Sequence, residues 1–425
     1  MDMDSENEKI CALALGRVFG EKPRIALALI ECFGSAQAVF EAGDRQLEEV
    51  LGPGSRYRGL LSARALEEAR SESQSLEKMG ARYLPCTDAA YPGALRDSED
   101  PPVGLYYRGC SPAEEIFAPE RPCVSIVGTR DASPYGLKQC EALVQALSTL
   151  QPAPVIVSGL AYGIDICAHR TALHCGLPTL AVMATGIDRI YPWQHRMDAE
   201  AMANTPGCAL LTDYPLDTPA VALNFVRRNR IIAALSRWTV LVESREKGGG
   251  MITARLAFGY GREVYALPGR LDDLRSQGCN RLIATKVAEA YTSPEELLEA
   301  MGLRQPTPGR RSGPAPAVGG RPGVAGGLGL ADESGGGAVG CGPGSMEEAS
   351  RKTARRFYAE KMSPDDLEAV TKMLIRIRAD CGVTLMQLAE DLHLSEYKVG
   401  ALSSLLEADG LINVDLLKRC RIGSD

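Results

Sequence analysis

Short apolar runs alternate with helical segments through the middle of this sequence, and this alternation limits the folds that the chain can adopt. The runs are CVSIVG (123–128), APVIVSG (153–159), TLAVMATG (179–186), CALLTDYP (208–215), WTVLVES (238–244) and EVYALPG (263–269). Helical patterns lie between them, near 136–149, 164–176, 196–204, 227–236 and 251–260. Strands alternating with helices predict βαβ units and an α/β fold: a Rossmann-like, doubly wound, mostly parallel sheet. Ligands of such sheets bind beyond the carboxyl ends of the strands.

The sequence on either side of these runs predicts further domains. Residues 1–80 form short helical patterns broken by Gly and Pro, typical of a helix-hairpin-helix or SAM-like unit, and 81–303 form the Rossmann-like domain. Between 304 and 345, 20 of 42 residues are Gly or Pro and none is aromatic, so we expect a disordered linker over 304–350. A helix-turn-helix pattern within 351–425, with Ser395 as the expected N-cap, predicts a winged-helix-like domain.

The second helix of that C-terminal pattern is poor in cations. Lys398 is its only basic residue, and Glu396, Glu407 and Asp409 lie near it. A helix that reads duplex DNA usually presents cations to the phosphates. A structural or protein-contact role is therefore favoured, and specific DNA contact by 1–80 is also the weaker interpretation.

Composition excludes several classes of protein. The formal net charge is −7, from 47 basic and 54 acidic residues, so the whole chain is not a general polyanion binder. The 13 cysteines form no C-x-x-C pair and the four histidines form no ligand set, which predicts a reduced, cytoplasmic protein without a metal. The N-terminus is acidic, unlike a signal peptide, and no apolar run approaches the ~20 residues that span a bilayer. We expect no membrane association.

Four loops at the expected strand ends predict an anion site. Glycine lets backbone N–H groups approach an anion closely, and the following helix adds a favourable field. Several such loops on one rim, three with Arg or Lys in or beside them, favour phosphate binding. The candidate residues are Gly128, Thr129, Arg130, Ser158, Gly159, Tyr162, Phe225, Arg227, Arg228, Asn229, Arg230, Lys247, Gly248 and Gly249.

The segment NFVRRNRIIAALS (224–236) raises an electrostatic question. Apolar residues recur at i+3, i+4 and i+7 from Arg228, which predicts a helix with three arginines in its first turn: Arg227, Arg228 and Arg230. Cations are disfavoured at this positive end of a helix, and a bound phosphate would neutralise them. The alternative is that they pair with acids of the same domain, Asp213, Asp217 or Glu243.

Missing motifs argue against an enzyme. The sequence has no G-x-x-x-x-G-K-[ST], no G-x-G-x-x-G after the first strand, no G-x-S-x-G and no H-E-x-x-H. We therefore expect no cofactor, no metal and no catalytic residue. His169 is interpreted as a hydrogen-bonded residue before a base, and Asp165 as a helix N-cap. Phe225 beside the arginines favours single-stranded nucleic acid, because unpaired bases can stack on it. The alternative is that Phe225 is a core residue.

These loops closely resemble the DNA-processing protein A family (DprA, also called Smf) over about 85–300. The matching stretches are SIVGTRDASPYG, VSGLAYGIDICAHRTAL, GIDRIYP, NFVRRNRIIAALS, VLVESREKGGGMITARLA and REVYALPGRLDD. The resemblance implies a non-enzymatic homodimer that binds single-stranded DNA and loads RecA recombinase onto it during natural transformation. It places the DNA pocket at Arg130, Phe225, Arg228, Asn229, Arg230 and the loop at Lys247, Gly248 and Gly249.

Two other functions stay open. A Rossmann-like nucleotide phosphoribohydrolase would use a glycine-rich loop followed by a catalytic Glu, whereas KGGGMITARLA has Arg255 or its neighbours there. A transcription regulator would act through the C-terminal helix-turn-helix.

Overall fold

The computed structural model describes residues 3–20, 22–52, 54–55, 57–303, 343–358, 362–379, 383–408, 411–414 and 419–422. Its centre is a nine-stranded sheet with the order β1-β2-β6-β5-β4-β3-β7-β8-β9. The strands are β1 Ala81–Pro85, β2 Gly104–Arg108, β3 Cys123–Val127, β4 Val155–Ser158, β5 Thr179–Val182, β6 Ala209–Thr212, β7 Trp238–Leu241, β8 Glu263–Ala266 and β9 Glu289–Ala290. The predicted α/β class is confirmed.

The strand order creates one point where the direction of winding reverses. From β3 to β6 each new strand is added on one side, and β7 then returns to the other side of β3. Val124 of β3 pairs with Ile156 of β4 and with Trp238 of β7, both in parallel. The carboxyl ends of β3 and β7 therefore flank the topological switch point, where open α/β sheets bind ligands. Within the nine-stranded sheet, β1 pairs antiparallel with β2, and β2 pairs antiparallel with β6. Neither β1 nor β2 was among the predicted runs.

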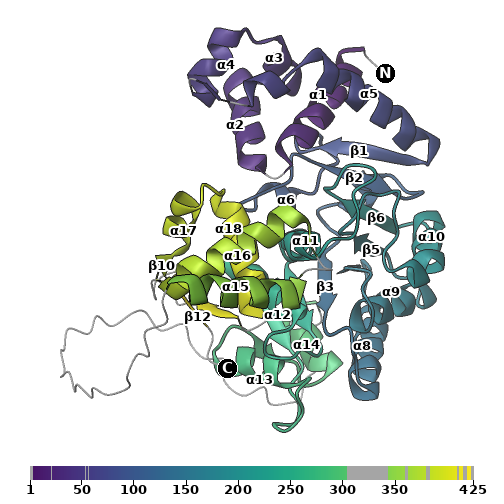
Figure 1. Cartoon of the computed structure of the whole chain (residues 1–425). Helices are drawn as coiled ribbons and strands as arrows, with labels where there is room; N and C mark the ends of the chain where they lie inside the picture. The colour runs from purple at the N-terminus through teal and green to yellow at the C-terminus, as the bar shows by residue number, and fades with distance from the viewer. Residues whose placement is uncertain are drawn as a thin grey trace, which may run out of the picture.

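Helices cover both faces of the sheet (Figure 1). They are α8 Pro134–Leu147, α9 Ile164–His174, α10 Arg196–Asn204, α11 Ala222–Leu235, α12 Gly249–Gly259, α13 Gln277–Ala284 and α14 Pro294–Ala300. Successive strand residues face opposite sides: Val155 and Val157 lie in one hydrophobic cluster with α11 and α12, whereas Ile156 lies in the other with α8 and α9. The near-continuous apolar runs follow from this burial on both faces.

The start of α11 differs from the prediction. The helix begins at Ala222, with Val221 as an extended N-cap residue, so the arginines lie in its second and third turns. The prediction of a start near Arg227 was wrong because the first turn is also apolar: Leu223 is buried in the hydrophobic cluster of the C-terminal unit. The electrostatic conflict at the positive end of the helix therefore does not arise.

The N-terminal helices pack against the antiparallel edge of the sheet, where α1 and α5 contact β1 (Figure 1). They are α1 Met3–Phe19, α2 Pro23–Phe33, α3 Ala36–Glu41, α4 Asp44–Leu51 and α5 Ala63–Lys78. Their buried residues belong to the same hydrophobic cluster as one face of the sheet. The half-buried Arg17 pairs with Glu72, which also accepts a hydrogen bond from the Tyr106 hydroxyl at 3.1 Å.

The C-terminal unit has helices and a small sheet in a winged-helix-like arrangement. Its elements are α15 Pro343–Tyr358, α16 Pro364–Ala379, β10 Val383–Thr384, α17 Leu385–Asp391, α18 Glu396–Ala408, β11 Ile412–Val414 and β12 Arg419–Ile422. The Ser395 hydroxyl accepts the Lys398 N–H at 3.1 Å, as an N-cap does. Of the predicted linker 304–350, residues 343–350 are helical and 304–342 lie outside the described residues.

The helix α18 packs against the body of the protein. It contacts α11 and α12, and the Lys398 ammonium pairs with Asp366 at 2.7 Å. The one cation of the predicted recognition helix is thus used inside its own unit, as the structural interpretation expects. Among the helices of the described residues, none is both long and apolar enough to cross a membrane.

His169 of α9 is fully buried and keeps one tautomer. The Thr179 hydroxyl donates to the Ile156 carbonyl at 2.9 Å, so its oxygen accepts from His169 Nδ1 at 2.8 Å. Nε2 is then a buried acceptor without a hydrogen-bond donor in the described part of the chain. Burial, reinforced by the nearby Arg228 charge, lowers the pKa of His169 to about 3.

We predict that His169 makes the protein acid-sensitive. Because the pKa falls on folding, its contribution to stability is present above about pH 6.5 and is lost as the pH falls toward about 3. The free energy of unfolding should fall by about 1.4 kcal/mol for each pH unit in that window. Urea unfolding at neutral and at acidic pH measures this dependence. His169→Asn keeps a hydrogen-bond donor for Thr179 but does not titrate, so its unfolding free energy should decrease less on acidification than that of the parent protein. Equal decreases in the two proteins would contradict the prediction.

Candidate nucleic-acid interface

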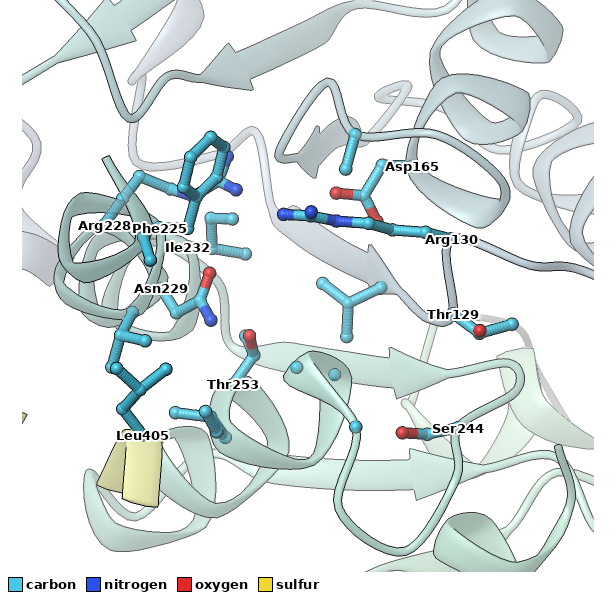
Figure 2. Close-up of a pocket in the computed structure, with 18 of the residues that line it drawn as sticks. Thr129, Arg130, Asp165, Phe225, Arg228, Asn229, Ile232, Ser244, Thr253 and Leu405 are labelled. Atoms are coloured by element: carbon cyan, nitrogen blue, oxygen red, sulfur yellow. The ribbon is translucent and has the colours of Figure 1, made fainter. Parts of the chain in front are cut away.

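A hollow of about 1010 Å³ lies at the switch point of the sheet (Figure 2). Its walls are the loop after β3, the loop after β7 with the start of α12, and the first half of α11. Met362, Ser363 and Leu405 of the C-terminal unit complete the lining. Three segments that are distant in the sequence thus meet where the fold predicts a ligand site.

Most of the predicted binding residues line this hollow. They are Gly128, Thr129, Arg130, Phe225, Arg228, Asn229, Lys247, Gly248 and Gly249. Tyr191 also lines the hollow but was not among the predicted residues, although it lies in the family stretch GIDRIYP. The three lining residues of the C-terminal unit were not predicted either, because no local sequence pattern marks them.

Glycines allow the two central loops to approach each other closely. A Cβ on Gly128 would lie 2.6 Å from the Ile164 side chain, and a Cβ on Gly250 would lie 2.6 Å from Leu241 and 3.4 Å from the Gly128 Cα. By contrast, a Cβ on Gly249 would meet no atom within 4 Å. The helix α12 begins at this open glycine, and Gly248, as N-cap, supplies no side-chain acceptor. Backbone N–H groups at the start of α12 are therefore available to an anion.

Arg130 and Lys247 are two cations that line the hollow. Neither forms an ion pair with another described residue, in contrast to Arg245, which pairs with Asp131 at 3.8 Å. Figure 2 shows Arg130 reaching across the hollow beside Asp165. Its guanidinium lies 5.1 Å from the centre of the Phe225 ring, a cation–π arrangement. Positive charge and an aromatic face are thus presented together.

Arg228 is a fixed cation beneath the hollow. It is 3% exposed and donates to the carbonyls of Gly159, at 2.7 Å, and Val182. Burial lowers its pKa to about 10, so the side chain stays charged at neutral pH. Asp165 is not the N-cap of α9, which is Gly163; instead it accepts the Gly159 N–H at 3.2 Å. Burial raises the pKa of Asp165, and the charges of Arg228 and Arg130 oppose that shift.

The structure does not bring the remaining predicted residues, Ser158, Gly159, Tyr162, Arg227 and Arg230, to the lining. The Ser158 hydroxyl donates to the Ile126 carbonyl at 2.6 Å inside the sheet, and Gly159 is covered by the Arg228 guanidinium. Arg230 pairs with Asp213 at 2.5 Å, the ion-pair alternative considered from the sequence. Arg227 is 9% exposed, and the Tyr162 hydroxyl donates to Gln194.

Fold and site together define a Rossmann-like α/β protein with a cationic, glycine-lined hollow at its switch point. The chain belongs to the DNA recombination-mediator protein A family, whose model matches residues 82–302.

Individual relatives agree with this assignment. Protein Smf of Escherichia coli is 37% identical over 224 residues, which cover 53% of this chain and 58% of that protein. Protein Smf of Synechocystis is 33% identical over 299 residues, covering 70% and 74%. The X-ray structure of DNA processing protein A from Streptococcus pneumoniae superposes with a TM-score of 0.59 at 30% identity, covering 69% of this chain and 97% of that one. The match thus spans less than two thirds of the E. coli relative.

We predict that Arg230 stabilises the fold. In Arg230→Ala, Asp213 would stay largely buried without this cation, which should lower the free energy of unfolding by about 3–5 kcal/mol. Arg245→Ala is the matched control, because its pair with Asp131 is exposed and should contribute less than about 1 kcal/mol. Urea denaturation measures both, and a small effect of Arg230→Ala would contradict the structural role.

Proposed function

We propose that this protein binds single-stranded DNA in the hollow without cleaving it, and acts as a homodimer that loads RecA recombinase onto the bound strand. The observation that carries the proposal is the Arg130 guanidinium over the Phe225 ring, in a hollow that is also lined by Lys247 and by the open backbone of Gly249. The membership of a recombination-mediator family supports DNA as the ligand. The resemblance to DprA proteins supports RecA and the homodimer.

Phosphates would bind along the loops after β3 and β7. Arg130 and Lys247 supply positive charges and form no ion pair with another described residue, although Asp165 lies beside Arg130. The start of α12 adds N–H donors and a positive field. Contacts of this kind are independent of base sequence. The buried charge of Arg228 adds to the potential without moving.

Unpaired bases would bind at Phe225. Its ring makes an edge contact with Tyr191, with centroids 5.4 Å apart and planes at 63°, while the Arg130 guanidinium lies over the ring. Bases stack on aromatic faces and on guanidinium planes. The bases of a duplex already stack on one another, so this site favours an unpaired strand.

The polar groups of the site have structural roles that favour binding over cleavage. Asp165 accepts a backbone N–H of the β4 loop, and its carboxylate lies beside Arg228. His169, the other candidate for proton transfer, is fully buried against Thr179. Arg255 or its neighbours stand where a phosphoribohydrolase would need a Glu. The packing of α18 on α11 likewise disfavours a transcription regulator that inserts this helix into duplex DNA.

We predict that Arg130→Ala and Lys247→Ala each weaken binding to single strands of any sequence. Each lost phosphate contact should reduce the slope of log K against log salt by about 0.7. Anisotropy of a labelled oligonucleotide at several salt concentrations measures affinity and slope together. Arg270→Ala is the control, because this exposed arginine pairs with Asp272 and is not part of the lining. Unchanged slopes in both variants would contradict the proposal.

A further inference from the structure

We infer that the bound strand continues from the hollow onto a second surface, the aromatic ledge, formed by Tyr162, Tyr191, Trp193 and Arg196. This inference rests on the proposed function and extends its binding site. The ledge would stack bases that lie beyond those held at Phe225.

The ledge lies next to the hollow on the same rim of the sheet. Tyr191 and Trp193 belong to the segment that follows β5, and Tyr162 belongs to the loop that follows β4. In the order β5-β4-β3, β4 lies directly beside β3 and β5 is the next strand beyond it, and neighbouring strands are about 4.8 Å apart. Tyr191 itself lines the hollow and contacts Phe225. A strand that leaves Phe225 across the rim therefore meets the ledge.

The rings of the ledge are exposed. Tyr162 is 40% exposed, Tyr191 47% and Trp193 66%, whereas Trp238, the other tryptophan of the chain, is 3% exposed. Large apolar side chains gathered on a surface mark an interaction site more often than singly scattered ones do. Here three rings from two neighbouring loops gather beside a candidate binding site.

Buried contacts hold the ledge in one conformation. His195 is 3% exposed, and its Nδ1 lies 2.8 Å from the Leu160 carbonyl of the β4 loop. The Tyr162 ring meets His195 edge-on, with centroids 4.9 Å apart, and the Tyr162 hydroxyl donates to Gln194 at 2.6 Å. The two loops are thus tied together, so little conformational entropy would be lost when a ligand binds.

The charge of the ledge favours a nucleic acid over a protein partner. The Arg196 guanidinium lies 4.5 Å from the centre of the Trp193 ring and forms no ion pair with another described residue. Its neighbours Arg170 and Arg189 are paired, with Asp198 and Asp217 respectively. The Arg130 guanidinium lies over the Phe225 ring in the same cation–π arrangement. Each of these two pairs combines an aromatic ring, on which a base can stack, with a cation that can contact a phosphate. Such a repeated arrangement matches the alternation of bases and phosphates along a nucleic-acid strand.

The fluorescence of Trp193 can report on binding at the ledge. Because Trp238 is buried, fluorescence quenching on DNA addition reports mainly on Trp193. Oligo-dT of about 15 nucleotides should quench this emission, and oligo-dT of about 5 nucleotides, which fills the hollow alone, should not. Trp193→Ala should weaken binding of the longer strand at least about fivefold and leave the shorter one unchanged. Trp193→Phe should restore the affinity but not the emission.

Phe258→Ala is the matched control, because Phe258 is an exposed ring near the far end of α12 and should not affect binding. If the longer strand binds the parent and Trp193→Ala equally, the ledge is overturned while the proposed function stands. If neither strand binds the parent, the proposed function itself fails. If Trp193→Ala changes the oligomeric state measured by sedimentation but not the DNA affinity, the ledge is a protein–protein interface, and the inference is also overturned.

Discussion

The site depends on one buried interaction, the Arg228 guanidinium held by the carbonyls of Gly159 and Val182. It ties α11 to the carboxyl ends of β4 and β5. Phe225 lies three residues earlier on the same helix, so this anchor also fixes where the ring stands over the rim. Burying the charge is unfavourable, as its lowered pKa shows, and the neighbouring Asp165 offsets part of that penalty. We interpret Arg228 as a positioning residue for the binding surface.

The sequence predicts the positions of the loops that form this site better than the burial and pairing of its charged residues. Apolar runs mark buried strands, and the chain order of strands and helices brings their end loops to one rim. The local pattern therefore placed Arg130 and Lys247 at this rim, where both line the hollow. The local sequence pattern could not predict that Arg230 is buried. Its ion-pair partner Asp213 follows the end of β6, and the sequence spacing left Asp217 and Glu243 as equally possible partners. The true start of α11 was hidden because Leu223 packs against a distant part of the chain.

The C-terminal unit is part of the site as well as a separate fold. Leu405 of α18 and Met362 before α16 line the hollow, and Leu223 of α11 is buried among residues of this unit. A local pattern identifies a helix-turn-helix but not the surface on which it packs. The structure places this helix against the Rossmann-like domain, where it forms a wall of the candidate interface.

We propose above that the rim of the sheet binds an unpaired strand in preference to a duplex. Competition between a labelled single strand and unlabelled single- or double-stranded DNA of the same sequence, at modest ionic strength, measures this preference. We expect the unlabelled single strand to displace the probe at much lower concentration than the duplex, and Phe225→Ala to reduce this difference in concentration. Equal displacement by single- and double-stranded DNA would show that the rim has no preference for unpaired strands.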